Sequence, residues 1–187
     1  MAGSTRHHGD ADETHMILQA WQQHGSPQAL LIIVPRHPER FDTAVQTAQD
    51  LGLRVQRRSS GEAVHANTQV WVGDSMGEMF AYYQVADVVF VGGSLVDTGC
   101  QNIIEPMSCG KAVLFGTSTY NFQAVCADAL AAGAAAQIAS ADELVHTVNA
   151  WLAHPEQCAD KREKARDFVA QHQGASERIA AAIAESL

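Results

Sequence analysis

One stretch, residues 85–116, constrains the fold more than any other part of the sequence. Its β-branched run from Val88 to Val91 is typical of a strand that is buried on both faces of a parallel sheet. Two glycines and a serine, residues 92–94, end the run and allow a ligand to approach the main chain closely. A polar loop and a short helix lead into a second apolar run, Ala112 to Phe115. This order predicts a parallel α/β sheet, whose ligands bind at the carboxyl ends of the strands.

The short helix in this stretch carries a carboxylate with two interpretations. Asn102 is the candidate N-cap, and Glu105 follows three residues later, close to capping-box spacing. Glu105 either caps its own helix or accepts hydrogen bonds from the two hydroxyls of a ribose. Pro106 disfavours α geometry at Glu105, which favours the ligand interpretation. The candidate phosphate contacts are the backbone N–H groups of Gly92, Gly93 and Ser94.

A second loop with ligand chemistry follows the predicted strand Leu30–Val34. It reads Pro35-Arg36-His37-Pro38-Glu39-Arg40, and its prolines restrict the backbone. Arg36 and Arg40 are candidate anion-binding residues, because a guanidinium pairs well with phosphate or carboxylate. The alternative is a solvated loop whose charges cap the next helix.

A third such loop follows the predicted strand Thr68–Val72. Gly73 and Gly77 indicate a tight turn into a helix, and Asp74 or Ser75 can cap that helix. Glu78 lies one turn further on. These residues either line a ligand site or serve only as caps.

Composition and charge exclude several classes of protein. The 187 residues are 47% apolar and 18% charged, which fits one globular domain with a sizeable core. A formal charge of -9 argues against binding to nucleic acid or to anionic lipid. No apolar run is long enough to cross a bilayer. Four cysteines form no C-x-x-C pair and are expected to be free thiols in a reducing compartment: Cys100, Cys109, Cys126 and Cys158.

Cofactor and metal signals are weak. There is no G-x-G-x-x-G with a distant ribose-binding acid and no Walker lysine motif, so NAD and ATP hydrolysis are poor interpretations. An acid- and histidine-rich segment fits no standard zinc spacing and is interpreted as a polar helix entry: His7, His8, Asp10, Asp12, Glu13 and His15. We therefore expect no cofactor and no metal site.

Six strands alternating with helices predict an α/β fold, a doubly wound (Rossmann-like) parallel sheet in one domain, 1–187. The predicted strands are Leu30–Val34, Leu53–Gln56, Thr68–Val72, Val88–Val91, Ala112–Phe115 and Ala135–Ile138. Helices are expected at Ala11–His24, Pro38–Leu51, Phe80–Val85, Ala124–Ala132 and from Ser140. Further helices over 155–187, the last at Glu177–Ser186, pack on this domain. Ala2 to Thr5 read as the tail of a strand, so the first strand is expected to be a stub.

The motifs together resemble those of a known family. Val91-Gly92-Gly93-Ser94, followed by Gly99-Cys100-Gln101-Asn102-Ile103-Ile104-Glu105-Pro106, is similar to the donor-site signature of bacterial 3-deoxy-D-manno-octulosonic acid (Kdo) transferases. The P-R-H-x-x-R and G-D-[ST]-x-G-E patterns and the Ser4-Thr5 pair extend the resemblance over residues 3–122. The family usually has His where this chain has Gln101, and Gly where it has Cys100.

This resemblance implies a GT-B glycosyltransferase that inverts configuration while moving Kdo from CMP-Kdo to a lipid A precursor. It implies that the chain is the C-terminal, donor-binding half, with CMP-Kdo or CMP as its partner. The general base, the acceptor site and the membrane contact are then expected on a missing N-terminal domain. The full-length protein is expected at the cytoplasmic face of the inner membrane. This chain alone is expected to be soluble and inactive, and nucleic acid is not expected as a partner.

On this interpretation no catalytic residue is assigned to the chain. The residues assigned to donor binding are Ser4, Thr5, Pro35, Arg36, His37, Arg40, Gly73, Asp74, Ser75, Gly77, Glu78, Gly92, Gly93, Ser94, Asn102 and Glu105. Two alternatives remain open: another nucleotide-sugar GT-B enzyme, such as a hexosyltransferase or an epimerase, and a nucleotide-binding module without catalysis.

Overall fold

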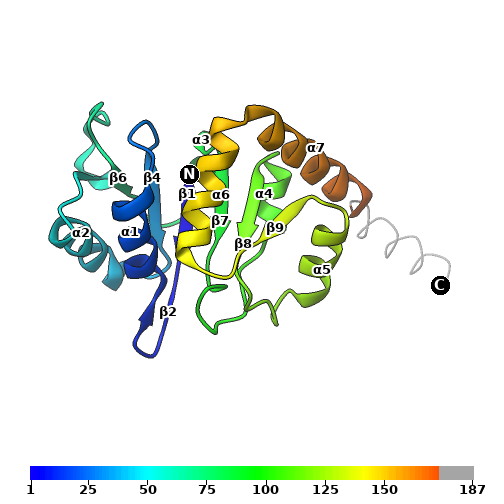
Figure 1. Ribbon diagram of the computed structural model, residues 1–187. Coiled ribbons are helices and arrows are strands. Elements are labelled where there is room, and N and C mark those ends of the chain that lie inside the picture. The colour runs from blue at the N-terminus through cyan, green and yellow to red at the C-terminus, as the bar shows by residue number, and fades with distance from the viewer. Residues whose placement is uncertain (173–187) are drawn as a thin grey trace, which may run out of the picture.

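The computed structural model describes residues 1–172, and the predicted last helix, Glu177–Ser186, lies outside them. Seven parallel strands form one sheet in the order β5-β6-β4-β1-β7-β8-β9 (Figure 1). Their bounds are β1 Ala2–Thr5, β4 Leu31–Pro35, β5 Val55–Arg57, β6 Val70–Val72, β7 Val88–Val91, β8 Ala112–Phe115 and β9 Ala135–Gln137. The six predicted strands are confirmed, with shifted ends at four of them.

Helices cover both faces of the sheet, because side chains on each strand alternate between the two faces. One core contains Leu31 and Ile33 and is covered by α1 (Glu13–His24), α2 (Phe41–Asp50) and α6 (Ala141–Ala153). The other contains Ile32 and Val34 and is covered by α3 (Met79–Val85), α4 (Ile104–Ser108), α5 (Gln123–Ala131) and α7 (Pro155–His172). Figure 1 shows α1 and α6 in front of the sheet. The doubly wound α/β fold is therefore confirmed.

The first strand is complete, and the prediction of a stub was wrong. β1 is as long as β7 and β8, and all four of its residues pair with β4. Its other edge pairs with β7 through Ala2 and Gly3. The ladder extends to Met1, whose carbonyl accepts a hydrogen bond from the Ile32 N–H at 2.8 Å. β1 thus holds the centre of the sheet and places its carboxyl end between two of the predicted ligand loops.

Two predicted helices begin later than expected. Residues 7–12 form a hairpin of β2 (His7–His8) and β3 (Ala11–Asp12), so α1 begins at Glu13 and not at Ala11. Asp12 caps α1 by accepting a hydrogen bond from the Thr14 N–H at 2.9 Å. The predicted helix Pro38–Leu51 is a 3-10 turn, η1 (Pro38–Arg40), followed by α2. A second 3-10 turn, η2 (Arg58–Ser60), lies in the predicted surface loop.

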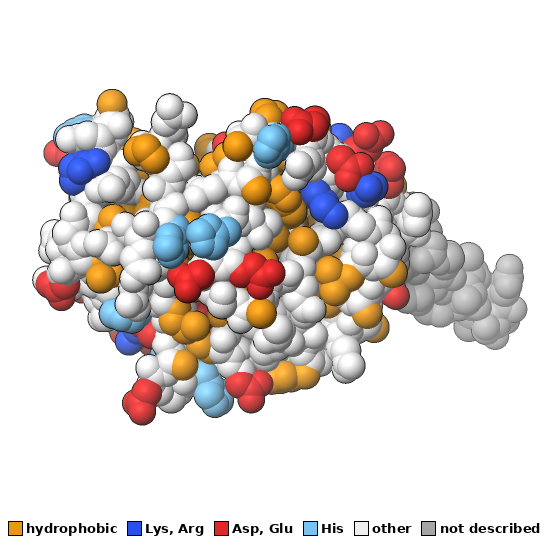
Figure 2. Space-filling model, in the orientation of Figure 1, with side chains coloured by type: hydrophobic (Ala, Val, Ile, Leu, Met, Phe, Trp, Pro, Cys, Tyr) orange, Lys and Arg blue, Asp and Glu red, His pale blue; other side chains and the backbone are white. Residues whose placement is uncertain are grey.

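The surface agrees with the acidic composition. On the face shown in Figure 2, basic side chains do not gather into one patch. Among the helices within residues 1–172, none combines the length and apolar character needed to span a membrane. The predicted ligand loops lie at the carboxyl edge of the sheet.

Candidate functional site

Three neighbouring strands bring the predicted loops together. β4, β1 and β7 are adjacent and parallel, so the loops that follow them meet at one edge of the sheet. A pocket of about 350 Å³ lies there, and three of the predicted site residues line it: Arg36, Asn102 and Glu105. The others that line it are Arg6, Tyr83, Cys100, Gln101, Asn121 and Phe122.

Asn102 and Glu105 form one side of this pocket. The Asn102 side chain accepts a hydrogen bond from the Ile104 N–H at 3.0 Å and donates one to Glu105 Oε1 at 3.3 Å. The N-cap is Ile103, one residue later than predicted, and Glu105 lies inside α4. Contrary to the prediction, Pro106 leaves Glu105 in α geometry, because a proline in the first turn lacks only an N–H that has no intrahelical partner. Glu105 Oε2 accepts no hydrogen bond from residues 1–172, so a ligand hydroxyl can reach it.

The glycine loop has a different role from the predicted one. Three of its N–H groups donate to the carboxylate of Glu13: Gly93 at 2.7 Å, Ser94 at 3.0 Å and Leu95 at 2.8 Å. The Arg6 N–H donates to the same carboxylate at 2.8 Å. Glu13 is fully buried, and burial raises the pKa of its carboxyl, although these four hydrogen bonds oppose the increase. An internal carboxylate thus occupies the anion site that was predicted for a phosphate.

Gly92 and Ser94 form hydrogen bonds between the ends of neighbouring strands. The Gly92 N–H donates to Ser4 Oγ at 3.2 Å. Ser94 is fully buried; its hydroxyl donates to the Val91 carbonyl at 2.6 Å and accepts from the Gly116 N–H at 2.7 Å. The assignment of Gly92, Gly93 and Ser94 to the phosphate is corrected, because every one of these N–H groups already has a partner inside the protein.

We expect Gly92→Ala to lower the free energy of unfolding by at least about 3 kcal/mol. A β-carbon at Gly92 would lie 2.0 Å from the Ser4 carbonyl oxygen, a backbone atom that cannot move aside. The matched control is Gly3→Ala in β1, where the added carbon would lie an ordinary 3.5 Å from Phe90. Urea unfolding followed by circular dichroism measures both variants, and equal stabilities would contradict the close approach at Gly92.

Ser4 and Thr5 are structural. Both side chains are buried, at 5% and 2% exposure. Thr5 Oγ1 lies 2.8 Å from the hydroxyl of Thr14 on α1, which ties the end of β1 to the start of that helix. Both hydroxyls have partners inside the protein, and their assignment to donor binding stays a prediction.

The arginine loop divides between the pocket and the scaffold. Arg36 is exposed, and its guanidinium donates to Gln101 Oε1 at 3.2 Å. Arg40 forms an ion pair with Asp12, so it is not the free cation that was predicted. Pro35 ends β4 in register with Thr5, and His37 is the exposed N-cap of η1. Of this loop, only Arg36 faces the pocket.

The loop after β6 is held by other partners. Asp74 accepts hydrogen bonds from the N–H and the hydroxyl of Ser59, at 2.8 and 2.5 Å. Glu78 accepts from Ser75 and from Arg58, the latter at 3.1 Å, and these donors lower the pKa of its carboxyl, Ser75 contributing most. None of the loop's predicted residues lines the pocket described above: Gly73, Asp74, Ser75, Gly77 and Glu78. Their assignment to donor binding stays a prediction.

Comparison with known proteins identifies the family. The family model for glycosyl transferases group 1 matches residues 14–168. The chain belongs to this glycosyltransferase family.

Among relatives, a 3-deoxy-D-manno-octulosonic acid transferase from Bordetella pertussis is 39% identical over 163 residues, which are 87% of this chain and 38% of the relative. The enzyme of the same name from Haemophilus influenzae is 35% identical over 154 residues, 82% of this chain and 36% of the relative. The chain therefore spans well under half the length of these relatives.

Solved structures agree with this placement. The C-terminal CMP-Kdo binding domain of WaaA from Acinetobacter baumannii superimposes with a TM-score of 0.83 at 34% identity, over 90% of this chain and 87% of that one. Anabaena Alr3699/HepE in complex with UDP superimposes at 0.62 with 15% identity, over 98% of this chain and 48% of that one, which shows the shared fold alone.

Several residues that line the pocket were not predicted as site residues. Tyr83 on α3 is buried; burial, and then the charge of Glu105, raise the pKa of its phenol. Asn121 donates to the Thr98 carbonyl at 2.9 Å and comes from the loop after β8. Arg6 was not predicted as a site residue, and Gln101 was described only as a departure from the family pattern. Their types give no signal in sequence, since a tyrosine or asparagine near a strand end is common.

Cys100 has an unusual backbone for its residue type. Its φ is 66°, a left-handed conformation that favours glycine. The side chain is buried at 3% exposure in the core that contains α4 and α5. The thiol thus packs in the core although its backbone is strained. The chain turns at Cys100, and the next residue, Gln101, lines the pocket.

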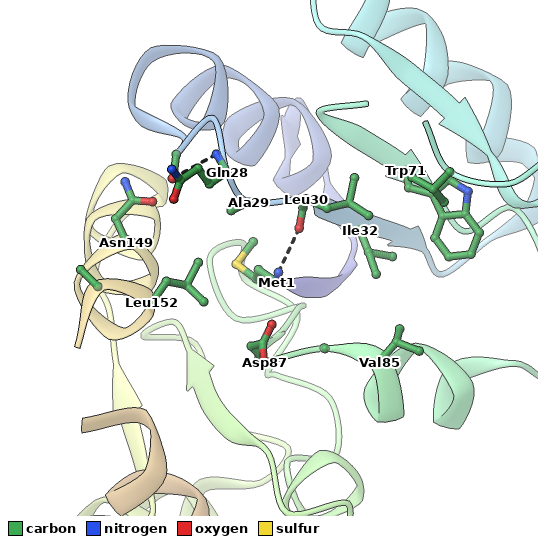
Figure 3. A pocket seen from close by; sticks show the side chains of 14 residues that line it. Met1, Gln28, Ala29, Leu30, Ile32, Trp71, Val85, Asp87, Asn149 and Leu152 are labelled. Atoms are coloured by element: carbon green, nitrogen blue, oxygen red, sulfur yellow. Dashed lines mark hydrogen bonds between the residues drawn. The ribbon is translucent and has the colours of Figure 1, made fainter. Parts of the chain in front are cut away.

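A larger cavity of about 890 Å³ lies at the opposite edge of the sheet (Figure 3). Met1, Leu30, Ile32, Trp71 and Leu152 are among its largely apolar lining residues. The amino group of Met1 donates to the Leu30 carbonyl at 3.0 Å, and burial lowers the pKa of this group. Because doubly wound sheets bind ligands at the carboxyl ends of their strands, this cavity is not the donor site despite its size.

Proposed function

We propose that this chain is the donor-binding half of a Kdo transferase, which transfers Kdo from CMP-Kdo to a lipid A precursor with inversion. The observation that carries the proposal is the similarity, at 34% identity over 90% of the chain, to a domain described as binding CMP-Kdo. The pocket supports it, because the Asn-x-x-Glu-Pro motif presents a free carboxylate oxygen there.

The pocket residues have distinct roles in this proposal. Glu105 Oε2 accepts hydrogen bonds from the ribose hydroxyls, and Asn102 holds the carboxylate in place. Arg36 neutralises the phosphate or the Kdo carboxylate as CMP departs. The remaining motif residues act mostly through the scaffold: Glu13 fixes the glycine loop, and Asp74 and Glu78 fix the loop after β6.

The rest of the reaction belongs to the longer protein. We infer that the acceptor, the general base and the membrane contact lie outside this chain, at the cytoplasmic face of the inner membrane. The whole of 1–187 is proposed as one nucleotide-sugar-binding domain with its C-terminal helices packed on it. The contacts of α7 with α4, α6 and β8 support that arrangement.

Glu105→Ala is the test of this function. We expect the wild-type chain to bind CMP weakly, since a GT-B donor also contacts the other domain. The variant should bind less tightly by about 1–3 kcal/mol, because a charged acceptor of the ribose hydroxyls is lost. Glu62→Ala, which removes an exposed carboxylate in the 61–67 loop, is the matched control.

NMR titration with CMP, UMP and UDP measures the affinities. The absence of any CMP-induced shift at millimolar concentration would contradict donor binding. Tighter binding of UDP than of CMP would favour the alternative of a hexosyltransferase or epimerase.

A further inference from the structure

Two hydrogen-bond donors in the pocket wall have no acceptor. Arg6 Nε and Gln101 Nε2 are buried, and neither has a hydrogen-bond partner. Both residues line the same pocket, together with Arg36 and Glu105. A buried donor without an acceptor costs about 1–3 kcal/mol, and two such donors in one pocket indicate that the pocket is built for an acceptor group.

The position of Arg6 is set by the backbone around it. Its N–H donates to Glu13 and its carbonyl accepts from the Glu13 N–H, at 2.8 and 3.0 Å, so the residue is tied to the start of α1 at both ends. Its side chain then passes over Gly93, where an added β-carbon would lie 3.3 Å from Arg6 Cδ. The glycine therefore gives the arginine room to run along the loop into the pocket.

The amide of Gln101 has a defined orientation. Its Oε1 accepts the hydrogen bond from Arg36, and a guanidinium can only donate. The NH2 group of the amide is consequently the end that remains without a partner. The backbone N–H of Gln101 donates to the Gly92 carbonyl at 3.1 Å, which fixes the residue beside the glycine loop.

The charge in the pocket is positive although the chain is acidic. Arg40, Arg57, Arg58 and Arg162 each pair with a carboxylate. Within residues 1–172, no carboxylate pairs with Arg6, and the side-chain partner of Arg36 is the neutral Gln101. The sequence has 21 carboxylate residues against 12 Lys and Arg, yet no carboxylate within residues 1–172 forms an ion pair with these two guanidinium groups.

We propose that Arg6, Arg36 and the NH2 group of Gln101 form an oxyanion site that binds the phosphate of the donor nucleotide. The site replaces the Gly92–Ser94 amides: the Gly92 N–H donates to Ser4, and the Gly93 and Ser94 N–H groups donate to Glu13. It gives a role to Gln101: one amide orients Arg36 through Oε1 and donates to the anion through Nε2. This inference rests on the proposed function, because the nucleotide it binds is that of the donor.

The test compares CMP with cytidine, which differ by the phosphate. Affinities of the wild-type chain and of Arg6→Gln are measured by NMR titration. We expect Arg6→Gln to bind CMP roughly ten- to a hundredfold more weakly and cytidine unchanged, since one charge-assisted hydrogen bond is lost. Gln101→Glu should weaken CMP at least as much, because its carboxylate would pair with the arginines and occupy the site. Arg54→Gln, an exposed arginine beyond the pocket, is the control for net charge.

Three results would overturn the site. The first is equal CMP affinity for Arg6→Gln and Arg54→Gln, and the second is that Arg6→Gln loses as much affinity for cytidine as for CMP. The third is that Arg6→Gln loses affinity for CMP-Kdo but not for CMP, which would assign Arg6 to the sugar carboxylate. Wild-type preference for UDP over CMP would refute the proposed function alone. In that case the oxyanion site predicts that Arg6→Gln weakens the binding of UDP but not the binding of uridine, and an equal effect on both would contradict it.

Discussion

Glu13→Ala is expected to lower the free energy of unfolding by about 4 kcal/mol or more, because it leaves four backbone N–H groups without an acceptor. Those donors lie in the loops after β1 and β7, so the loss reaches the centre of the sheet. A domain of this size has a stability of about 5–15 kcal/mol, and the melting temperature should fall by about 10 °C or more.

Two further variants separate the buried carboxylate from an ordinary first-turn acid. Glu143→Ala removes an exposed carboxylate from the first turn of α6, where it accepts one N–H, from Ala139 at 2.7 Å. This change should cost about 1 kcal/mol. Glu13→Gln should fall between the two, since the amide oxygen still accepts while its NH2 group faces donors. Equal falls in melting temperature for Glu13→Ala and Glu143→Ala would contradict the organising role of Glu13.

The fold was largely predictable because its signals are local. The strands Val88–Val91 and Ala112–Phe115 have the predicted bounds, since each is an apolar run closed by glycine or a polar residue. β1 was predicted to be a stub because Ala2 to Thr5 were interpreted as only the tail of a strand, whereas these four residues are the whole strand. Its ladder to β4 and the buried bonds of its hydroxyls supply the stability that the pattern does not show.

The site was less predictable because its decisive contacts join distant residues. Asn102, Glu105 and Arg36 were placed by motif, and the pocket contains all three. Glu13 looks like any acid in a first helical turn, and its partner Gly93 is 80 residues away. In the same way, Arg40 forms an ion pair with Asp12, and Asp74 accepts a hydrogen bond from Ser59, and neither partner could be predicted from local sequence. Local sequence shows which groups can bind an anion but not which are already occupied.

The other large effect concerns catalysis: we expect the 187-residue chain by itself to transfer no Kdo. An inverting transfer needs a general base within hydrogen-bond reach of the acceptor hydroxyl. Four carboxylates near the carboxyl edge have other roles. Glu13 accepts four N–H groups, Asp74 binds Ser59, and Glu78 binds Arg58. Glu105 accepts from Asn102 through Oε1, and its free Oε2 is assigned to the ribose. The chain also spans only 38% and 36% of the two relatives described above.

Holding both substrates in one geometry lowers a barrier by about 7–11 kcal/mol, and a chain that binds only the donor forgoes this. We therefore expect a rate at least about a thousandfold below that of a full-length enzyme. The chain is incubated with CMP-Kdo and a lipid A precursor, and the glycolipid is quantified by mass spectrometry so that donor hydrolysis is not counted. The full-length Bordetella pertussis relative serves as the positive control, and CMP binding in the same sample shows that the chain is folded. Turnover comparable to the control would mean that one of the carboxylates assigned to the scaffold is a catalytic base.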